Sequence, residues 1–271
     1  LADVIFIMSL NEKENTIKLI SIARDCYAFV PGHTNPMKIN AAMTYGGPDL
    51  LMSVVQSSLR IEIDEYAFVN FYHMEQIIDT LGGVYVHVSE SERSADGGLN
   101  AIIRNQNLNL GVDEERHIVQ NSGYQRLNGR QAVAYSRIRY VGRGDFQRSE
   151  RQVEVLESMM TQFMALNLSS KMNVVEIMAS HVSTNITRDM IDYYFFSFLA
   201  SMSVPEFEYL QIPLSGYSNQ GMYNDVRQGE WSIRNDWNAT IPVVQEYLYG
   251  ETYPFDPVRQ IPNAPVVSAD D

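Results

Sequence analysis

Hydrophobic and polar residues alternate along two short runs near the start of the chain. Residues 3–10 (DVIFIMSL) and 16–23 (TIKLISIA) are rich in β-branched residues and are separated by the polar stretch NEKEN, which predicts two strands joined as a hairpin. Residues 24–47 contain several prolines and glycines and indicate a loop. Pro48 then opens PDLLMSVVQSSL, whose apolar spacing predicts an amphipathic helix.

The next segments alternate between strand and helix patterns. We expect a strand over 65–71 (EYAFVNF), a helix over 72–81 (YHMEQIIDTL) and a strand over 84–88 (VYVHV). Strand–helix–strand alternation indicates the α/β class. The sequence therefore predicts a single α/β/α sandwich domain with a central mixed β-sheet flanked by helices.

The second half of the chain is predicted to be mainly helical. Segment 89–124 is polar, and we expect it to form a surface excursion with one weak helix. A short helix is expected from Asn128 or Gly129, and a strand is expected over 206–214. Further helices are expected over 149–168, 171–181, 188–202 and 236–249. We find no internal repeat or linker, so we predict one domain over 1–250 and a Pro-rich tail over 251–271.

Composition and charge exclude several classes of protein. The chain of 271 residues is 45% hydrophobic, which is typical of a folded protein, and has no apolar run long enough to span a bilayer. A net charge of −13 argues against nucleic acid as a partner, because binding the phosphate backbone needs a broad basic surface. Cys26 is the only cysteine, which excludes an internal disulfide. The chain opens with a strand pattern, so we expect it to begin inside a longer protein whose membrane anchor precedes it.

One segment of this acidic chain is rich in arginine. Between residues 137 and 152 the arginines are Arg137, Arg139, Arg143, Arg148 and Arg151, against Asp145 and Glu150. In an extended loop, which Gly142 and Gly144 favour, Arg137 and Arg139 leave the same face. Arg148, Arg151 and Gln152 share one face near the start of the predicted helix. Two interpretations stay open: a cradle for a phosphate or pyrophosphate, or a solvated face of salt bridges.

Two other stretches with charged residues precede the arginine-rich segment. Arg24 and Asp25 end an apolar strand, where α/β folds place ligand contacts, although such residues are also ordinary solvent contacts. Lys38 lies in MKINAAMTYGGPDLL, which matches no nucleoside-triphosphate-binding motif and signals little alone.

Taken in order, five motifs are more specific than any one of them. SIARD, KINAAMTYGG, DTLGGVYVHV, LNGRQAVAYSRIRY and GDFQRSERQ resemble the LytR-CpsA-Psr family, from Asp3 to about residue 168 and less sharply through QIPLSG at 211–216. The resemblance implies an enzyme on the extracytoplasmic face of the bacterial cell membrane, anchored by an N-terminal helix. Such enzymes transfer a teichoic acid, capsular or other wall glycopolymer from a polyprenyl-pyrophosphate carrier to peptidoglycan, using magnesium or manganese.

The family's functional residues transfer to this sequence position by position. The resemblance implies that Arg24, Arg137 and Arg139 are catalytic and that Asp3 joins the metal shell. The residues implied to bind the pyrophosphate are Lys38, Arg148, Gln152 and Asp25. The chain departs from the family pattern at four places: Ala23 replaces a proline, Tyr140 replaces a histidine, Leu1 and Ala2 replace an arginine and a hydroxyl residue, and a second metal-binding aspartate lies upstream of Leu1.

Two alternative functions remain at this point. The same pocket could pass the phosphoryl group to water, as a polyprenyl-pyrophosphate phosphatase. It could also hold a lipid phosphate without turnover, as a regulatory module of the envelope.

A stripe of methionine and phenylalanine on the long helix, with apolar residues of segment 65–71, fits either a lipid channel or ordinary core. Those residues are Met159, Met160, Phe163, Met164, Phe68, Val69 and Phe71. The general base is Asp3 or a metal-bound water, and the sequence ranks neither.

Overall fold

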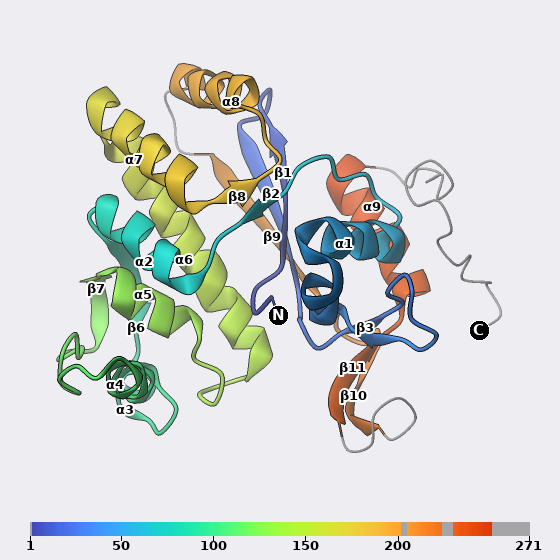
Figure 1. The fold of residues 1–271 in the computed structure, drawn as a ribbon, viewed down its shortest axis with the longest axis horizontal. Coiled ribbons are helices and arrows are strands. Elements are labelled where there is room, and N and C mark those ends of the chain that lie inside the picture. The colour runs from blue at the N-terminus through green and yellow to red at the C-terminus, as the bar shows by residue number, and fades with distance from the viewer. Residues whose placement is uncertain (1, 202–204, 224–229, 251–271) are drawn as a thin grey trace. The chain divides into compact units, whose positions relative to one another are not determined.

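The computed structural model describes residues 2–201, 205–223 and 230–250 (Figure 1). The Pro-rich tail predicted over 251–271 lies outside these residues. The chain groups into two compact units, and each is described by itself. Unit 1 contains residues 2–66, 185–192, 207–223 and 230–250, and unit 2 contains residues 67–184, 193–201 and 205–206. The single domain expected over 1–250 stays a prediction.

Unit 1 is built around a three-stranded sheet in the order β1-β2-β9 (Figure 1). Its other strand pairs are β3 with β4 and β10 with β11, and an isolated parallel bridge joins Cys26 to Ile233. Helices α1 and α9 pack against each other in this unit. The elements are β1 (Phe6–Asn11), β2 (Thr16–Ile22), β3 (Tyr27–Ala28), β4 (Met37–Lys38), the 3₁₀ helix η1 (Ile39–Ala41), α1 (Ala42–Leu59), β9 (Glu206–Ile212), β10 (Ser218–Tyr223), β11 (Glu230–Asn235) and α9 (Trp237–Tyr249).

The predicted hairpin at the start of the chain is confirmed. β1 and β2 pair antiparallel from Phe6 opposite Ser21 to Asn11 opposite Thr16. Ile20 and Ile22 of β2 belong to the buried core cluster of unit 1, and Leu19 is also fully buried. Burial of this strand explains its nearly continuous hydrophobic run, since a strand covered on both faces has no polar side to show.

Helix α1 begins earlier than the sequence predicts, and the reason is a kink. The chain is helical from Ala42, but Gly46 and Gly47 leave helical geometry, with Gly47 at φ +67°. Only glycine adopts this conformation readily, so the pair separates a short first turn from the straight helix that Pro48 opens. The predicted start at Pro48 is therefore right for the straight part of α1.

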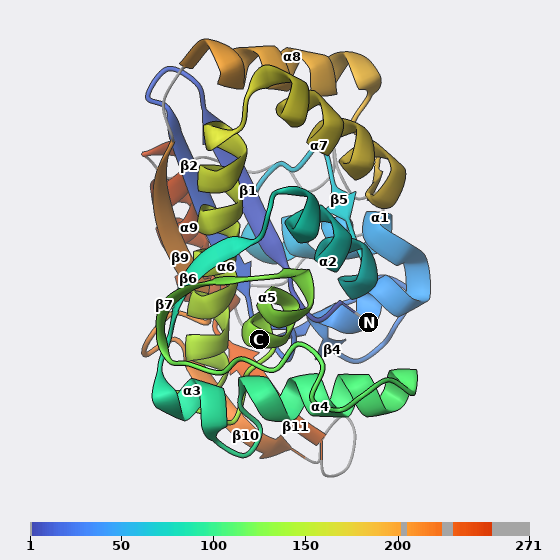
Figure 2. The same ribbon diagram turned by 90° about the vertical axis from the view of Figure 1, so that its left-hand side faces the viewer.

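Unit 2 consists of helices packed around the antiparallel strand pair β6–β7. Helix α5 contacts α2, α4 and α6, as Figure 2 shows, and the second strand pair joins β5 to β8. The elements are β5 (Ala67–Phe68), α2 (Phe71–Thr80), β6 (Val84–Val88), α3 (Glu90–Ser94), α4 (Leu99–Leu110), β7 (Gly123–Leu127), α5 (Gly129–Ser136), α6 (Asp145–Ala165), α7 (Leu168–His181) and β8 (Ser183–Thr184). Helix α8 (Arg188–Ser201) runs in sequence from unit 1 into unit 2.

Close contact between α2 and α5 requires a glycine at the start of α5. A Cβ atom on Gly129 would lie 2.0 Å from the backbone oxygen of Glu75. The backbone N–H of Gly129 donates to Oδ1 of Asp79 at 2.7 Å. Asn128 caps α5, because its side chain accepts from the backbone N–H of Gln131 and the Gln131 side chain accepts from that of Asn128. This confirms the helix start expected at Asn128 or Gly129.

Several boundaries differ from the expected ones. Only Ala67 and Phe68 of segment 65–71 pair as a strand, and α2 begins at Phe71. Segment 89–124 is more regular than expected, because it holds α3, the twelve-residue α4 and the first two residues of β7. The α/β class, with mixed strand pairing and flanking helices, is confirmed. The two-residue strands β3 and β4 were not predicted, since so short a strand leaves little periodicity to detect. The six-residue strands β10 and β11 were also not predicted, and their sequences, SNQGMY and EWSIRN, are largely polar.

The methionine and phenylalanine stripe of α6 packs as core in unit 2. Met159 and Phe163 pack against a buried cluster that contains Ile77, Leu81 and Val174. This contact supports the core interpretation for these two side chains.

Candidate functional site

In unit 1 the structure places Asp25 between two cations. Oδ1 of Asp25 lies 2.9 Å from Nζ of Lys38, and Oδ2 lies 3.6 Å from Nε of Arg24. Asp25 is only 5% exposed, so its charge depends on these partners for stabilisation. The carboxylate therefore fixes Arg24, which the resemblance implies to be catalytic, and Lys38, which it implies to bind the pyrophosphate.

Local pairing of β3 and β4 explains why these residues meet. Lys38 lies opposite Tyr27 in this antiparallel pair. The backbone N–H of Ile39 donates to the oxygen of Cys26 at 2.7 Å, and that of Asn40 donates to the oxygen of Arg24 at 3.4 Å. Segment 37–40 is thus held along segment 24–27. The loop expected over 24–47 contains this ordered pair, which the sequence did not reveal.

Asp3 reaches the same cluster through Arg24. Nη1 of Arg24 donates to Oδ1 of Asp3, so the Arg24 guanidinium lies between the carboxylates of Asp3 and Asp25. The side chains of Arg24 and Asp3 are 27% and 40% exposed, so both remain accessible to a ligand. A guanidinium has five N–H donors, and these two ion pairs leave others for phosphate oxygens.

In unit 2 the first two arginines of the arginine-rich segment follow α5. Arg137 is the C-terminal cap residue of α5 and is exposed, with its guanidinium carbon 4.9 Å from the centre of the Phe71 ring. A cation is favourable at a helix C-terminus because the helix dipole is negative there. Arg139 is half-buried in the loop after α5. Both residues follow the last helical residue of α5, as expected, but Arg137 has φ −100° and ψ −6° and is therefore not in the extended conformation that would send both side chains to one face.

Arg148 and Gln152 lie one turn apart on α6. Both are largely buried, and Nε2 of Gln152 donates to the backbone oxygen of Ser136 at 3.2 Å. The first turns of α6 are therefore held against the end of α5, which carries Arg137. Helix α6 begins at Asp145, four residues earlier than expected, so Arg148 lies in its first turn.

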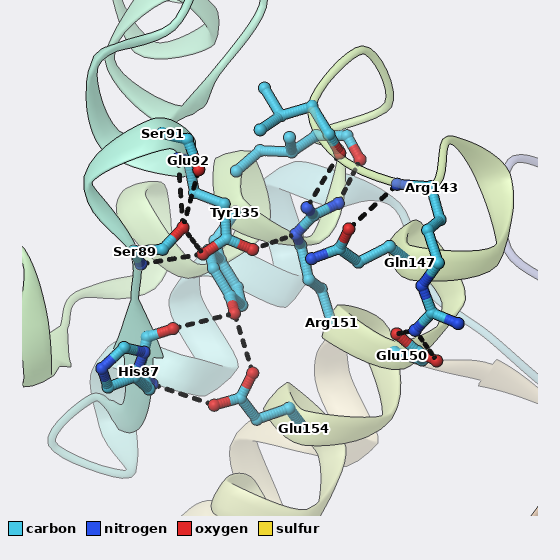
Figure 3. Close-up of polar contacts among 12 residues, drawn as sticks. His87, Ser89, Ser91, Glu92, Tyr135, Arg143, Gln147, Glu150, Arg151 and Glu154 are labelled. Carbon is cyan, nitrogen blue, oxygen red and sulfur yellow. Dashed lines mark hydrogen bonds and ion pairs between the residues drawn. The ribbon is translucent and has the colours of Figure 1, made fainter.

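The remaining two arginines of the segment do not belong to an open anion site. Arg151, which the sequence places on one face with Arg148, is only 2% exposed, and its donors are satisfied by protein oxygens (Figure 3). Arg143 forms an exposed ion pair with Glu150, with Nη2 at 2.7 Å from both carboxylate oxygens (Figure 3). The salt-bridged interpretation is thus right for Arg143, while Arg151 is buried instead.

Sequence reasoning missed the partner of Arg151, which is Glu92. Glu92 lies in the segment expected to be an irregular excursion, yet it is only 5% exposed. Burial raises the pKa of the Glu92 carboxyl, but hydrogen bonds from Ser89 and Arg151 outweigh that effect and hold the pKa below its ordinary value. The spacing of Ser89 and Glu92 matches a helix-capping box and was the signal available in the sequence.

The predicted site residues thus form two sets, each within one unit. Asp3, Arg24, Asp25 and Lys38 are brought together in unit 1. Arg137, Arg139, Arg148 and Gln152 lie at the end of α5, in the loop after it and in the first turns of α6 in unit 2. That both sets act on one pyrophosphate stays a prediction.

The metal assignment rests on one carboxylate, that of Asp3. Among the described residues there is no group of three or more His, Cys, Asp or Glu side chains arranged to hold a metal ion. Mg²⁺ is commonly held by one or two carboxylates together with substrate phosphates and water, rather than by an all-protein cage. The accessible carboxylate of Asp3 fits this mode, in which the phosphates supply the other ligands.

Comparisons with known proteins identify relatives of this chain. The chain is 32% identical over 190 residues to the polyisoprenyl-teichoic acid–peptidoglycan teichoic acid transferase TagV of Bacillus subtilis, which covers 68% of this chain and 45% of the relative. It is 30% identical over 190 residues to the corresponding transferase TagU of Enterococcus faecalis, with 70% and 55% covered. The chain spans about half the length of these curated relatives.

Solved structures give the same result for the fold. The structure of TagT bound to LIIa-WTA matches with a TM-score of 0.69 at 25% identity, covering 93% of this chain and 85% of that one. The crystal structure of B. subtilis TagV matches with a TM-score of 0.68 at 25% identity, covering 91% and 89%. In the described part of this chain, none of the helices is both long and apolar enough to cross a bilayer. The model of the LytR_cpsA_psr family matches residues 1–235, and the chain belongs to this family.

Proposed function

We propose that this chain transfers a glycopolymer from a polyprenyl-pyrophosphate carrier to peptidoglycan. The names of the curated relatives support a teichoic acid as the polymer, and the structure of TagT bound to LIIa-WTA supports a polymer precursor as the ligand. The observation that carries the proposal is that positively charged side chains are held in place by a protein carboxylate. In a chain with net charge −13, Arg24 and Lys38 are both held by the buried carboxylate of Asp25.

Pyrophosphate transfer explains why fixed cations are needed. A hydroxyl oxygen of peptidoglycan forms a bond to the phosphorus on the sugar side, and its proton passes to a general base, for which the Asp3 carboxylate is the candidate on this chain. The bridging P–O bond breaks, and polyprenyl phosphate leaves with the electron pair. Negative charge spreads over the phosphate oxygens in the transition state, and preorganised cations stabilise it without reorganising.

Each predicted residue has a part in this step. Arg24, Arg137 and Arg139 donate to the phosphate oxygens on which charge develops, since a guanidinium binds phosphate with two parallel hydrogen bonds. Lys38 contributes a point charge held in place by Asp25. Arg148 and Gln152 bind or orient the headgroup from the first turns of α6. Asp3 would hold a magnesium ion together with the phosphates, and that ion would neutralise part of the pyrophosphate charge.

We place this reaction at the outer face of the cell membrane. The donor is a lipid-linked glycan and the acceptor is the cell wall, so the enzyme has to act where both are present. We propose an N-terminal anchor upstream of residue 1 for the same reason, as in the expectation from the sequence.

Product analysis with purified chain tests the proposal. A polyprenyl-pyrophosphate-linked disaccharide is incubated with magnesium, with and without peptidoglycan fragments, and the products are separated by mass. Transfer gives disaccharide phosphate attached to the fragment and polyprenyl phosphate. Release of free disaccharide phosphate at the same rate without acceptor identifies a phosphatase instead. Tight binding with no turnover in either reaction identifies a lipid-phosphate-binding module, and both results contradict the proposal.

A further inference from the structure

Arg151 occupies the centre of a buried polar network in unit 2 (Figure 3). Its Nε donates to Oε1 of Glu92 at 2.7 Å. Its Nη1 donates to the backbone oxygen of Ile138 at 3.0 Å, and its Nη2 donates to the backbone oxygen of Val141 at 3.1 Å. One rigid guanidinium thus makes contact with a carboxylate and with two backbone oxygens of the same loop.

The two backbone oxygens lie on either side of a predicted catalytic residue. Arg139 follows Ile138 directly, and Val141 comes two residues later, so Arg151 holds both ends of the short segment that carries Arg139. The side chains of Ile138 and Val141 are buried in the core cluster of unit 2, whereas Tyr140 is 81% exposed. The loop is therefore tied to the interior through its ends while its middle faces outward.

Glu92 fixes the orientation of the Arg151 guanidinium. Oε2 of Glu92 accepts from the backbone N–H of Ser89 at 2.8 Å and from the Ser89 hydroxyl at 2.6 Å, which leaves Oε1 for Arg151. The capping box of α3 thus holds the Glu92 carboxylate in place, and this carboxylate orients the planar guanidinium of Arg151. A lysine in place of Arg151 has one nitrogen on a flexible stem and lacks the planar fork.

We infer that Arg151 is a positioning residue, which sets the place of Arg139 by holding the segment from Ile138 to Val141. The inference rests on the proposed function, because it assigns Arg139 to the transfer step. Buried ion pairs are weak evidence for stability but can define a unique geometry, and displacement of a reacting group by about 1 Å costs on the order of 100-fold in rate. The contacts of Arg151 are all with protein, so its effect on transfer passes through the loop.

The variant Arg151→Lys tests the inference against Arg143→Lys, the same exchange at an exposed position of the same segment. We expect Arg151→Lys to speed amide hydrogen exchange over residues 138–144 and to lower kcat/KM for transfer by on the order of 10- to 100-fold, because the loop is no longer held at both ends. Arg143→Lys leaves both quantities near wild type. The transfer substrates are the lipid-linked disaccharide and peptidoglycan fragments used above, at a temperature where circular dichroism shows both variants folded.

A double variant separates positioning from general destabilisation. If Arg151 acts through Arg139, Arg139→Ala combined with Arg151→Lys transfers no more slowly than Arg139→Ala alone. Where Arg151→Lys fails to fold, Glu92→Gln loosens the same fork from its other partner and gives the same two readouts. Faster exchange with wild-type transfer, or additive losses in the double variant, overturns the inference. If the proposed function is wrong, the wild-type chain itself does not transfer. Binding of farnesyl pyrophosphate to the wild type, and its loss in Arg151→Lys, then still tests how Arg139 is held.

Discussion

Nζ of Lys38 lies 2.9 Å from Oδ1 of Asp25, and the second oxygen of the same carboxylate faces Nε of Arg24 at 3.6 Å. Asp25 is buried, whereas the side chains of Arg24 and Lys38 are about one quarter exposed, at 27% and 23%. A buried anion therefore holds two cations at the surface of unit 1. This arrangement keeps the two cations in place.

Replacing Asp25 by Asn tests this relationship. We expect a loss of about 1–3 kcal/mol in the free energy of unfolding, because two partly exposed cations lose a buried anion. Transfer falls as well, since Lys38 and Arg24 are no longer fixed. Chemical denaturation and the transfer assay measure the two effects. The control is Glu208→Gln, which breaks the more exposed 4.0 Å contact with Lys18 and costs less than about 1 kcal/mol. Equal losses in both variants would contradict the special role of Asp25.

Removal of Arg137 is expected to affect activity without affecting the fold. Its side chain is exposed, so Arg137→Ala changes the free energy of unfolding by roughly 0.5 kcal/mol or less. Loss of a guanidinium that stabilises developing charge costs on the order of 100- to 1,000-fold in kcat. Single-turnover transfer and thermal unfolding report the two quantities. Unaltered turnover in Arg137→Ala would remove Arg137 from the site, and unaltered turnover in Arg139→Ala would remove Arg139.

Glu92 makes the stability of unit 2 depend on pH. Its pKa lies below the ordinary value of 4.5 in the folded chain, so the stabilisation is complete above pH 4.5 and is lost as the pH falls through the folded value. At neutral pH, Glu92→Gln leaves the buried Arg151 without its anion and lowers the free energy of unfolding by about 3 kcal/mol. The gap between wild type and variant is expected to narrow in urea titrations below about pH 4. A constant gap down to about pH 3 would argue against the ion pair as its source.

Substitution of Gly129 by Ala is expected to separate α2 from α5. The new Cβ atom would lie 2.0 Å from the backbone oxygen of Glu75, which a side-chain rotation cannot relieve. We expect a loss of about 3 kcal/mol, as for overpacking in a rigid core. Gly111→Ala is the control, because Gly111 has φ +65° but no atom within 4 Å of a built Cβ. It costs about 1 kcal/mol from backbone strain alone, so a calorimetric comparison isolates the contact with Glu75.

Magnesium dependence follows from the proposed role of Asp3. Chelation with EDTA is expected to stop transfer, and added Mg²⁺ is expected to restore it. Asp3→Asn keeps the shape of the side chain but removes its charge, so we expect the Mg²⁺ concentration for half-maximal transfer to rise roughly tenfold. Circular dichroism checks that the fold is retained. Transfer at full rate in EDTA would show that Asp3 has no metal-binding role.

The local pattern of residues predicted most helices and strands because it reflects which side chains are buried. The β1–β2 hairpin and the helix capped by Asn128 follow from residues close in sequence. Helix α8 was expected over 188–202 and runs from Arg188 to Ser201. The five ordered motifs also pointed to the family that the chain matches. These features need no knowledge of distant contacts.

The roles of individual charged residues depended on tertiary structure. By sequence, Arg148 and Arg151 share one face of the predicted helix, yet Arg148 lies in the first turn of α6 and Arg151 is fully buried, while Arg143 forms a surface ion pair. The burial of Arg151 depends on Glu92, which comes from a distant segment. Contacts of this kind are set by how helices pack, and the pattern along the chain does not encode them.

The sequence by itself determined the α/β class, the order of its main elements and the family to which the chain belongs, because hydrophobic periodicity and ordered motifs are local properties. The tertiary structure decided which cations are fixed and by what, since Lys38 meets Asp25 through β3–β4 pairing and Arg151 meets the loop of Arg139 through the packing of α6. The physical reason is that a buried charge is stable only beside its partner, and only the folded chain brings those partners together.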